Sequence, residues 1–131
     1  MNRRSTPEAN AQRAIVQALR FALPRDAIVH HCANEVTEAG SRGQIRQSIL
    51  VGMGVHTGFA DLIMISGGRV LFLEVKSQTG RLRKSQEVFR DTICAQGFGW
   101  ALVRSVDDAL AALADNGFTS RVRSPARRAQ P

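Results

Sequence analysis

The chain has 131 residues, with 18 Lys or Arg against 11 Asp or Glu and a formal net charge of +7. This length suits one domain with its own core. No apolar stretch approaches the ~20 residues that a transmembrane helix needs, and the polar start does not resemble a secretory signal. We therefore expect a soluble, intracellular protein. The two cysteines are not spaced as metal ligands, which argues against a zinc site.

Most of the excess positive charge lies near the two ends of the chain. Six basic residues are found there: Arg3, Arg4, Arg121, Arg123, Arg127 and Arg128. Such tails suit nucleic acid, because phosphate contacts release counterions, although they also serve simply to keep a protein in solution. We predict one domain over residues 6–118, a basic tail over residues 1–5 and a basic, disordered tail over residues 119–131.

Caps and apolar spacing predict the elements of the first half of the chain. Thr6-Pro7-Glu8 is typical of a helix start, and apolar residues with helical spacing continue this helix toward Pro24. A strand over residues 27–32 and an exposed loop over residues 33–43 follow. A short helix is expected over residues 44–51, before the glycines at 52 and 54.

The second half begins with a hairpin, since two apolar runs flank Gly67-Gly68. A helix over residues 84–96 ends at Gly97, and a strand over residues 98–103 follows. Ser105 then caps a last helix that runs to about Asp115. This order favours the α/β class, with a mixed central sheet flanked by helices. The run after the hairpin, strand–helix–strand, is expected to be a right-handed crossover.

The predicted hairpin gathers three charged residues. If Gly67-Gly68 forms a two-residue turn, the register places Asp61 opposite Glu74, and Lys76 shares the face of Glu74. Two opposed carboxylates repel unless a cation lies between them, and Mg²⁺ commonly uses one or two carboxylates. With the Lys76 ammonium alongside, the pattern predicts metal-assisted attack on a phosphodiester. The alternative is that these residues are simply the solvated ends of a hairpin.

Other charged residues are candidates for the same site. Glu8 lies on the buried edge of the first helix, where it either reaches the site of Asp61 or only stabilises the helix start. The basic cluster after Lys76 and a basic stripe on the first helix could contact phosphates, although a solvated helix face explains the stripe equally well. The candidate DNA contacts are Arg81, Arg83, Lys84, Arg13 and Arg20.

These residues give the chain a resemblance to the VRR-NUC group of the PD-(D/E)xK nuclease superfamily, over roughly residues 6–113. The matching segments are Glu8, His31-Cys32-Ala33-Asn34-Glu35, Gly52 to Asp61, Leu73-Glu74-Val75-Lys76 and Ser85-Gln86. One position departs from the family pattern, because the family's Pro-Asp is Ala60-Asp61 here. Proline carries no ligand atom, so the departure affects the backbone before the strand rather than the chemistry.

The resemblance implies a restriction-endonuclease-like fold and phosphodiester hydrolysis with Mg²⁺ or Mn²⁺. Asp61, Glu74 and the Val75 carbonyl would be metal ligands, Glu8 would bind the metal through water, and Lys76 would orient the attacking water or stabilise developing charge. Gln86 matches a family glutamine near the site, unless it is only an exposed helix amide.

The resemblance also implies a substrate and a partner. Minimal family members look like Holliday-junction resolvases that act as homodimers, so branched DNA and a second copy of the chain are the expected partners. No membrane and no small-molecule cofactor are expected, and the location is the cytoplasm of a bacterial cell or a phage-infected host. The alternatives are a nicking or sequence-specific endonuclease of the same fold, or a non-catalytic nucleic-acid-binding protein. A binding module has no need of opposed carboxylates, which disfavours the last of these.

Overall fold

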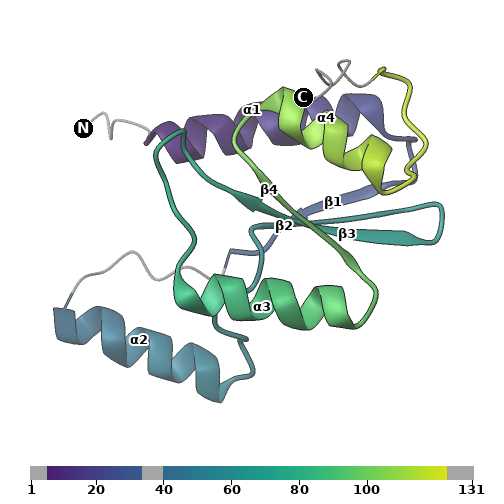
Figure 1. Cartoon of the computed structure of the whole chain (residues 1–131). Coiled ribbons are helices and arrows are strands. Elements are labelled where there is room, and N and C mark those ends of the chain that lie inside the picture. The colour runs from purple at the N-terminus through teal and green to yellow at the C-terminus, as the bar shows by residue number, and fades with distance from the viewer. Residues whose placement is uncertain (1–5, 34–39, 124–131) are drawn as a thin grey trace, which may run out of the picture.

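The computed structural model describes residues 6–33 and 40–123. Helices and strands alternate along the described chain except at the β2–β3 hairpin (Figure 1). In order they are α1 (Pro7–Ala22), β1 (Ile28–His31), α2 (Gly40–Gly52), β2 (Leu62–Ser66), β3 (Arg69–Val75), α3 (Lys84–Ala95), β4 (Gly99–Val103) and α4 (Val106–Asp115). No described helix is both long enough and apolar enough to cross a membrane.

The four strands form one mixed sheet in the order β1-β2-β3-β4. The first three pair antiparallel, and β4 pairs parallel with β3 after the α3 crossover. Helices α1 and α4 cover one face of the sheet and α3 covers the other, as Figure 1 shows. The predicted α/β class with a mixed, helix-flanked sheet is confirmed.

Alternating side chains of the central strands build two hydrophobic clusters. Leu62, Met64, Leu71 and Leu73 point to the face under α1 and α4, where the larger cluster lies. Phe72 points the other way and packs with Phe59 and Phe89 beneath α3. Because side chains alternate along a strand, Glu74 shares the α3 face with Phe72.

Local signals in the sequence predicted the bounds of most elements to within one or two residues of the observed bounds. The Thr6 hydroxyl accepts the Ala9 N–H at 3.1 Å and caps α1, and the Ser105 hydroxyl accepts the Asp108 N–H at 3.1 Å and caps α4. In the hairpin, Ser66 pairs with Arg69, and the predicted register holds outward as far as Leu62 and Leu73.

Two predictions about loops and tails differ from the structure. The segment over residues 40–43 is the first turn of α2 rather than loop, because the loop-favouring tendency of Gly and Ser is a weak prior. Residues 34–39 lie outside the described residues. The start of the predicted C-terminal tail packs on the body, since the Arg121 N–H donates to the Ala22 carbonyl at 2.9 Å and Val122 joins the larger cluster. The tail residues 1–5 and 124–131 are outside the described part of the chain.

Candidate active site

The charged ends of the hairpin are buried, not solvated. Asp61 is 4% exposed, Glu74 is 1% exposed and Lys76 is 5% exposed. Gln86, in the first turn of α3, is 6% exposed, so it is not an exposed helix amide. Charged side chains are almost never this buried unless they are paired. The four residues therefore form a built polar site within the fold.

Asp61 lies just before β2 and is held by both of its neighbouring strands. Its carboxylate Oδ2 accepts the Val75 N–H at 2.8 Å, and its backbone carbonyl accepts the Cys32 N–H at 2.8 Å. The strand pairing ends at Leu62 and Leu73, one position short of the predicted pair of Asp61 with Glu74. The Asp61 side chain takes the place of a backbone carbonyl there, which is why the regular ladder stops.

Glu74 is the centre of the polar contacts. The Gln86 side-chain amide donates to Glu74 Oε1 at 2.9 Å, and Lys76 Nζ lies 3.6 Å from the same oxygen. The other end of the Gln86 amide accepts the Arg83 N–H at 2.8 Å. Gln86 thus joins the Glu74 carboxylate to the start of α3 and fixes how the helix sits over the site.

The charges of the site are not balanced and would suit a bound cation. Two buried carboxylates carry two negative charges, and Lys76 supplies one positive charge in return. A hard divalent cation with carboxylate oxygens and waters as ligands would suit this donor set. Among the described residues, no three His, Cys, Asp or Glu side chains lie close enough to hold a metal ion together. Glu8 therefore does not join Asp61 and Glu74 as a third direct ligand, and a contact through water remains a prediction.

A tight approach of two backbone segments positions the site. Gly58 has φ +83°, and a Cβ at this position would lie 2.2 Å from the Ser85 carbonyl oxygen. The segment before Asp61 therefore rests directly on the first turn of α3, which carries Gln86. Ala60, where the resembling family has proline, is fully buried against the Phe72 and Phe89 cluster.

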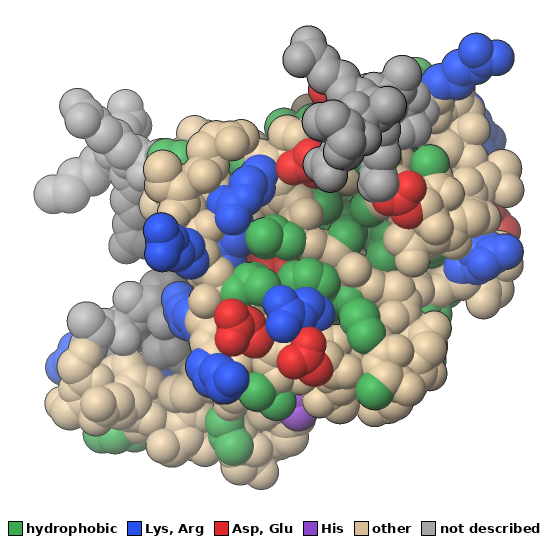
Figure 2. Space-filling view, viewed as in Figure 1, with side chains coloured by type: hydrophobic (Ala, Val, Ile, Leu, Met, Phe, Trp, Pro, Cys, Tyr) green, Lys and Arg blue, Asp and Glu red, His purple; other side chains and the backbone are tan. Residues whose placement is uncertain are grey.

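The basic residues near the site fall into two groups. Arg81, Arg83 and Lys84 are exposed at and just before the start of α3, and Figure 2 shows Lys and Arg side chains gathered over this end of the molecule. Arg13 and Arg20 are exposed on α1, which covers the opposite face of the sheet. The first group adjoins the carboxylates, whereas the second lies in another layer.

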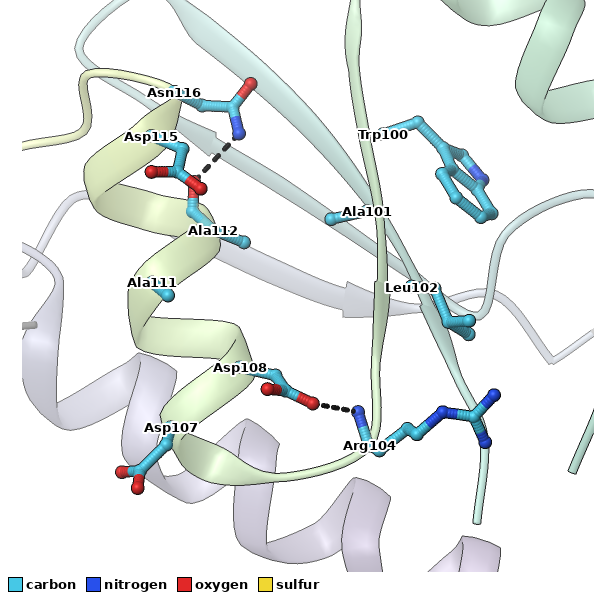
Figure 3. A pocket seen from close by; sticks show the side chains of 10 residues that line it. All are labelled: Trp100, Ala101, Leu102, Arg104, Asp107, Asp108, Ala111, Ala112, Asp115 and Asn116. Atoms are coloured by element: carbon cyan, nitrogen blue, oxygen red, sulfur yellow. Dashed lines mark hydrogen bonds between the residues drawn. The ribbon is translucent and has the colours of Figure 1, made fainter. Parts of the chain in front are cut away.

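Arg104 is a residue near the site that the sequence did not point to. It follows β4, and its guanidinium Nη1 donates to the carbonyls of Ser77 and Gly80, in the turn just after Lys76. It also lines a groove of about 590 Å³ between β4 and α4 (Figure 3). The groove carries three aspartates but none of the buried site residues, so we do not assign it to the site.

Cys32 lies beside Asp61, and burial, together with the Asp61 charge, raises the pKa of its thiol. Cys94 is exposed on α3. Because the thiolate is the reactive form, iodoacetamide at pH 8 should modify Cys94 well before Cys32, as peptide mass spectrometry would measure. Equal rates at the two positions would contradict the burial of Cys32.

The arrangement of the elements has a counterpart among solved structures. One that matches is described as a "VRR_NUC domain protein", and the similarity covers 95% of this chain and 100% of that chain with a TM-score of 0.64. The chain has the fold of this VRR-NUC domain protein. The two sequences are 15% identical, so the likeness concerns the fold. No protein-family model matches the chain, and no curated protein does.

Proposed function

We propose that this protein is a nuclease that hydrolyses phosphodiester bonds in DNA with the help of Mg²⁺ or Mn²⁺. The observation that carries the proposal is the burial of Asp61, Glu74 and Lys76, with the Asp61 carboxylate bonded to the N–H of Val75, between the other two residues, and with Gln86 donating to Glu74. A fold shared with a VRR-NUC domain protein supports it.

The residues of the proposed site would have distinct roles. Asp61 and Glu74 would hold the cation, with the Val75 carbonyl as a further ligand and Glu8 contributing through water. Bound there, the cation would lower the pKa of a water and neutralise phosphate oxygens. Lys76 is fixed beside Glu74 and directs its ammonium to the attacking water or to the charge that develops on the phosphate. Gln86 orients the Glu74 carboxylate.

The basic residues would hold the DNA without reading its sequence. Arg81, Arg83 and Lys84 adjoin the site and are exposed, so they can contact backbone phosphates, which position a substrate but do not specify bases. Arg13 and Arg20 lie on α1, in another layer of the fold, and would contact phosphates away from the site. This pattern favours selection of DNA by its shape, so branched DNA such as a four-way junction is the proposed substrate.

Helix α2 supports the proposal that the protein acts as a homodimer. It stands apart from the other described helices and strands (Figure 1), and Ile45 and Ile49 are 61% and 57% exposed. An isolated helix of ~12–15 residues is marginal in water, so this helix needs a partner. The two isoleucines are one helical turn apart and lie along one ridge of the helix surface. Because ridges pack into grooves, a second copy of α2 is a self-complementary partner, and two copies would bring two sites to two strands.

Cleavage of labelled substrates tests the function. We would compare four-way junction, flap, single-stranded and linear duplex DNA with Mg²⁺, Mn²⁺ or EDTA, using the wild type and Asp61→Asn. The asparagine can still accept the Val75 N–H, so it removes the charge but keeps the hydrogen bond. We expect the junction to be cut at paired positions, and we expect this cutting to require both the metal and Asp61. Cutting of flaps or linear duplex would favour another endonuclease of this fold, and binding without cleavage would overturn the enzyme assignment.

Light scattering after size exclusion tests the dimer. The wild type should elute at twice the mass of one chain, and Ile45→Ser combined with Ile49→Ser should elute as a folded monomer, because these side chains do not belong to either core cluster. Val88→Ser on α3, which is 50% exposed, is the matched control and should remain dimeric. A monomeric wild type at high concentration would contradict the proposal.

A further inference from the structure

Lys76 is followed at once by a turn that folds back over it. Within the turn the Gly80 N–H donates to the Ser77 carbonyl at 3.2 Å and to its hydroxyl at 3.1 Å. A Cβ at Gly80 would lie 3.4 Å from both Cβ and Cδ of Lys76. The Gly80 backbone therefore packs against the aliphatic part of the Lys76 side chain and covers it.

Arg104 holds this turn in place from the end of β4. Its Nη1 donates to the Gly80 carbonyl at 2.7 Å and also to the Ser77 carbonyl, so one guanidinium joins the two ends of the turn. Arg104 is itself fixed, because its backbone N–H donates to Asp108 Oδ2 at 2.9 Å. Figure 3 shows this bond to α4 and the Arg104 side chain extending from the strand end away from that helix.

The contacts link Arg104 to both functional parts of the proposed site. On one side of the turn lies Lys76, whose ammonium is 3.6 Å from Glu74 Oε1. On the other side the chain leads directly into the exposed Arg81 and Arg83. Within the described part of the chain, Arg104 bonds to neither carboxylate of the site, so any effect it has on the site passes through the backbone of the turn.

We propose that Arg104 is a positioning residue, which clamps the turn of residues 77–80 and thereby sets the place of the Lys76 ammonium and the path of the chain into Arg81 and Arg83. The catalytic role of this clamp rests on the proposed nuclease function, whereas its contacts can be tested separately. A guanidinium is suited to the role, because its planar array of donors can serve two carbonyls at once, whereas an ammonium is a point charge.

Limited trypsin digestion tests the clamp without any nuclease assay. In the folded wild type, the peptide bonds after Arg81 and Arg83 should be cut slowly, because the turn is held at both ends. In Arg104→Gln the cleavage at these two sites should rise about tenfold, the change expected for the loss of roughly one charge-assisted hydrogen bond. Cleavage elsewhere should stay at the wild-type rate.

Arg69→Gln is the matched control. Arg69 also donates from Nη1 to a backbone carbonyl, that of Asn116 at 3.5 Å, but at the opposite end of β3. This variant should leave cleavage after Arg81 and Arg83 unchanged. The proposal is overturned if Arg104→Gln digests as the wild type does, or if its cleavage rises equally at sites throughout the chain, which would indicate general unfolding.

The kinetics of DNA cleavage then test the link to Lys76. Arg104→Gln should lower kcat about tenfold, because the ammonium is displaced, and should raise KM by a smaller factor, because Arg81 and Arg83 are held less firmly but stay exposed and charged. Arg104→Lys should recover part of kcat by donating to one carbonyl. Loosening of the turn with an unchanged kcat would overturn the link to Lys76. If the wild type cuts no DNA, the proposed function fails, while the digestion result still decides whether the clamp exists.

Discussion

Lys76→Met should cut DNA about 10²–10³-fold more slowly than the wild type, the usual loss when one group that stabilises transition-state charge is removed. Methionine can fill much of the volume of the buried aliphatic stem, so the packing against Gly80 is kept. The dissociation constant for the DNA should change little, because the Lys76 side chain is 5% exposed and adds little to the charged surface.

The same substitution has a consequence for stability that cleavage does not report. Lys76 balances part of the charge of two buried carboxylates, and removing one partner of a buried ion pair costs about 3 kcal/mol or more. Without metal, Lys76→Met should therefore unfold at a lower temperature than the wild type. Added Mg²⁺ should recover more stability in the variant than in the wild type, because it replaces the missing positive charge.

Lys84→Met is the control for both measurements. Lys84 is exposed at the start of α3, so its loss should weaken DNA binding slightly and leave both the catalytic rate and the unfolding temperature near the wild-type values. If Lys76→Met cleaves at the wild-type rate, the ammonium has no part in the reaction and the assignment of this site is wrong.

The sequence predicted the hairpin and how its charged residues are arranged, because short-range rules decide both. A Gly-Gly turn between apolar runs fixes the register of a hairpin, and alternation along β3 then brings Glu74 and Lys76 to one face. The sequence did not decide whether the three charged residues are buried, because a solvated hairpin end remained the alternative, and the structure shows that they are buried. The one deviation is local: the Asp61 side chain, not its backbone, bonds to β3.

Other features depend on contacts between distant parts of the chain and carry no local signal. Arg104 bonds to carbonyls 24 and 27 residues earlier, and no residue pattern marks those carbonyls as acceptors. The start of α2 was missed for a different reason, because Gly40 and Ser41 favour loops in isolation and the helix exposes its apolar residues rather than burying them. The usual inference from the spacing of apolar residues to a buried helix face therefore does not apply to α2.

Gly58→Ala should be a severely destabilising substitution. The left-handed backbone at φ +83° costs an alanine about 1–2 kcal/mol. In addition, the new Cβ would lie 2.2 Å from the Ser85 carbonyl oxygen and 2.9 Å from the Gln86 nitrogen, which are backbone atoms and can yield only if α3 moves. We expect a total loss of more than about 3 kcal/mol, within the range of severe single substitutions.

The shift should also reach the proposed chemistry. Moving the first turn of α3 displaces Gln86 from Glu74 Oε1, at present 2.9 Å away, so any folded Gly58→Ala protein should cleave DNA poorly. Gly54→Ala, in the same connection, is the matched control: it has φ +104° but no atom within 4 Å of the added Cβ, so it carries the backbone cost alone. Thermal unfolding of the two variants separates the cost of the left-handed backbone from the cost of the clash with α3. Equal losses of stability would show that α3 does not rest on Gly58.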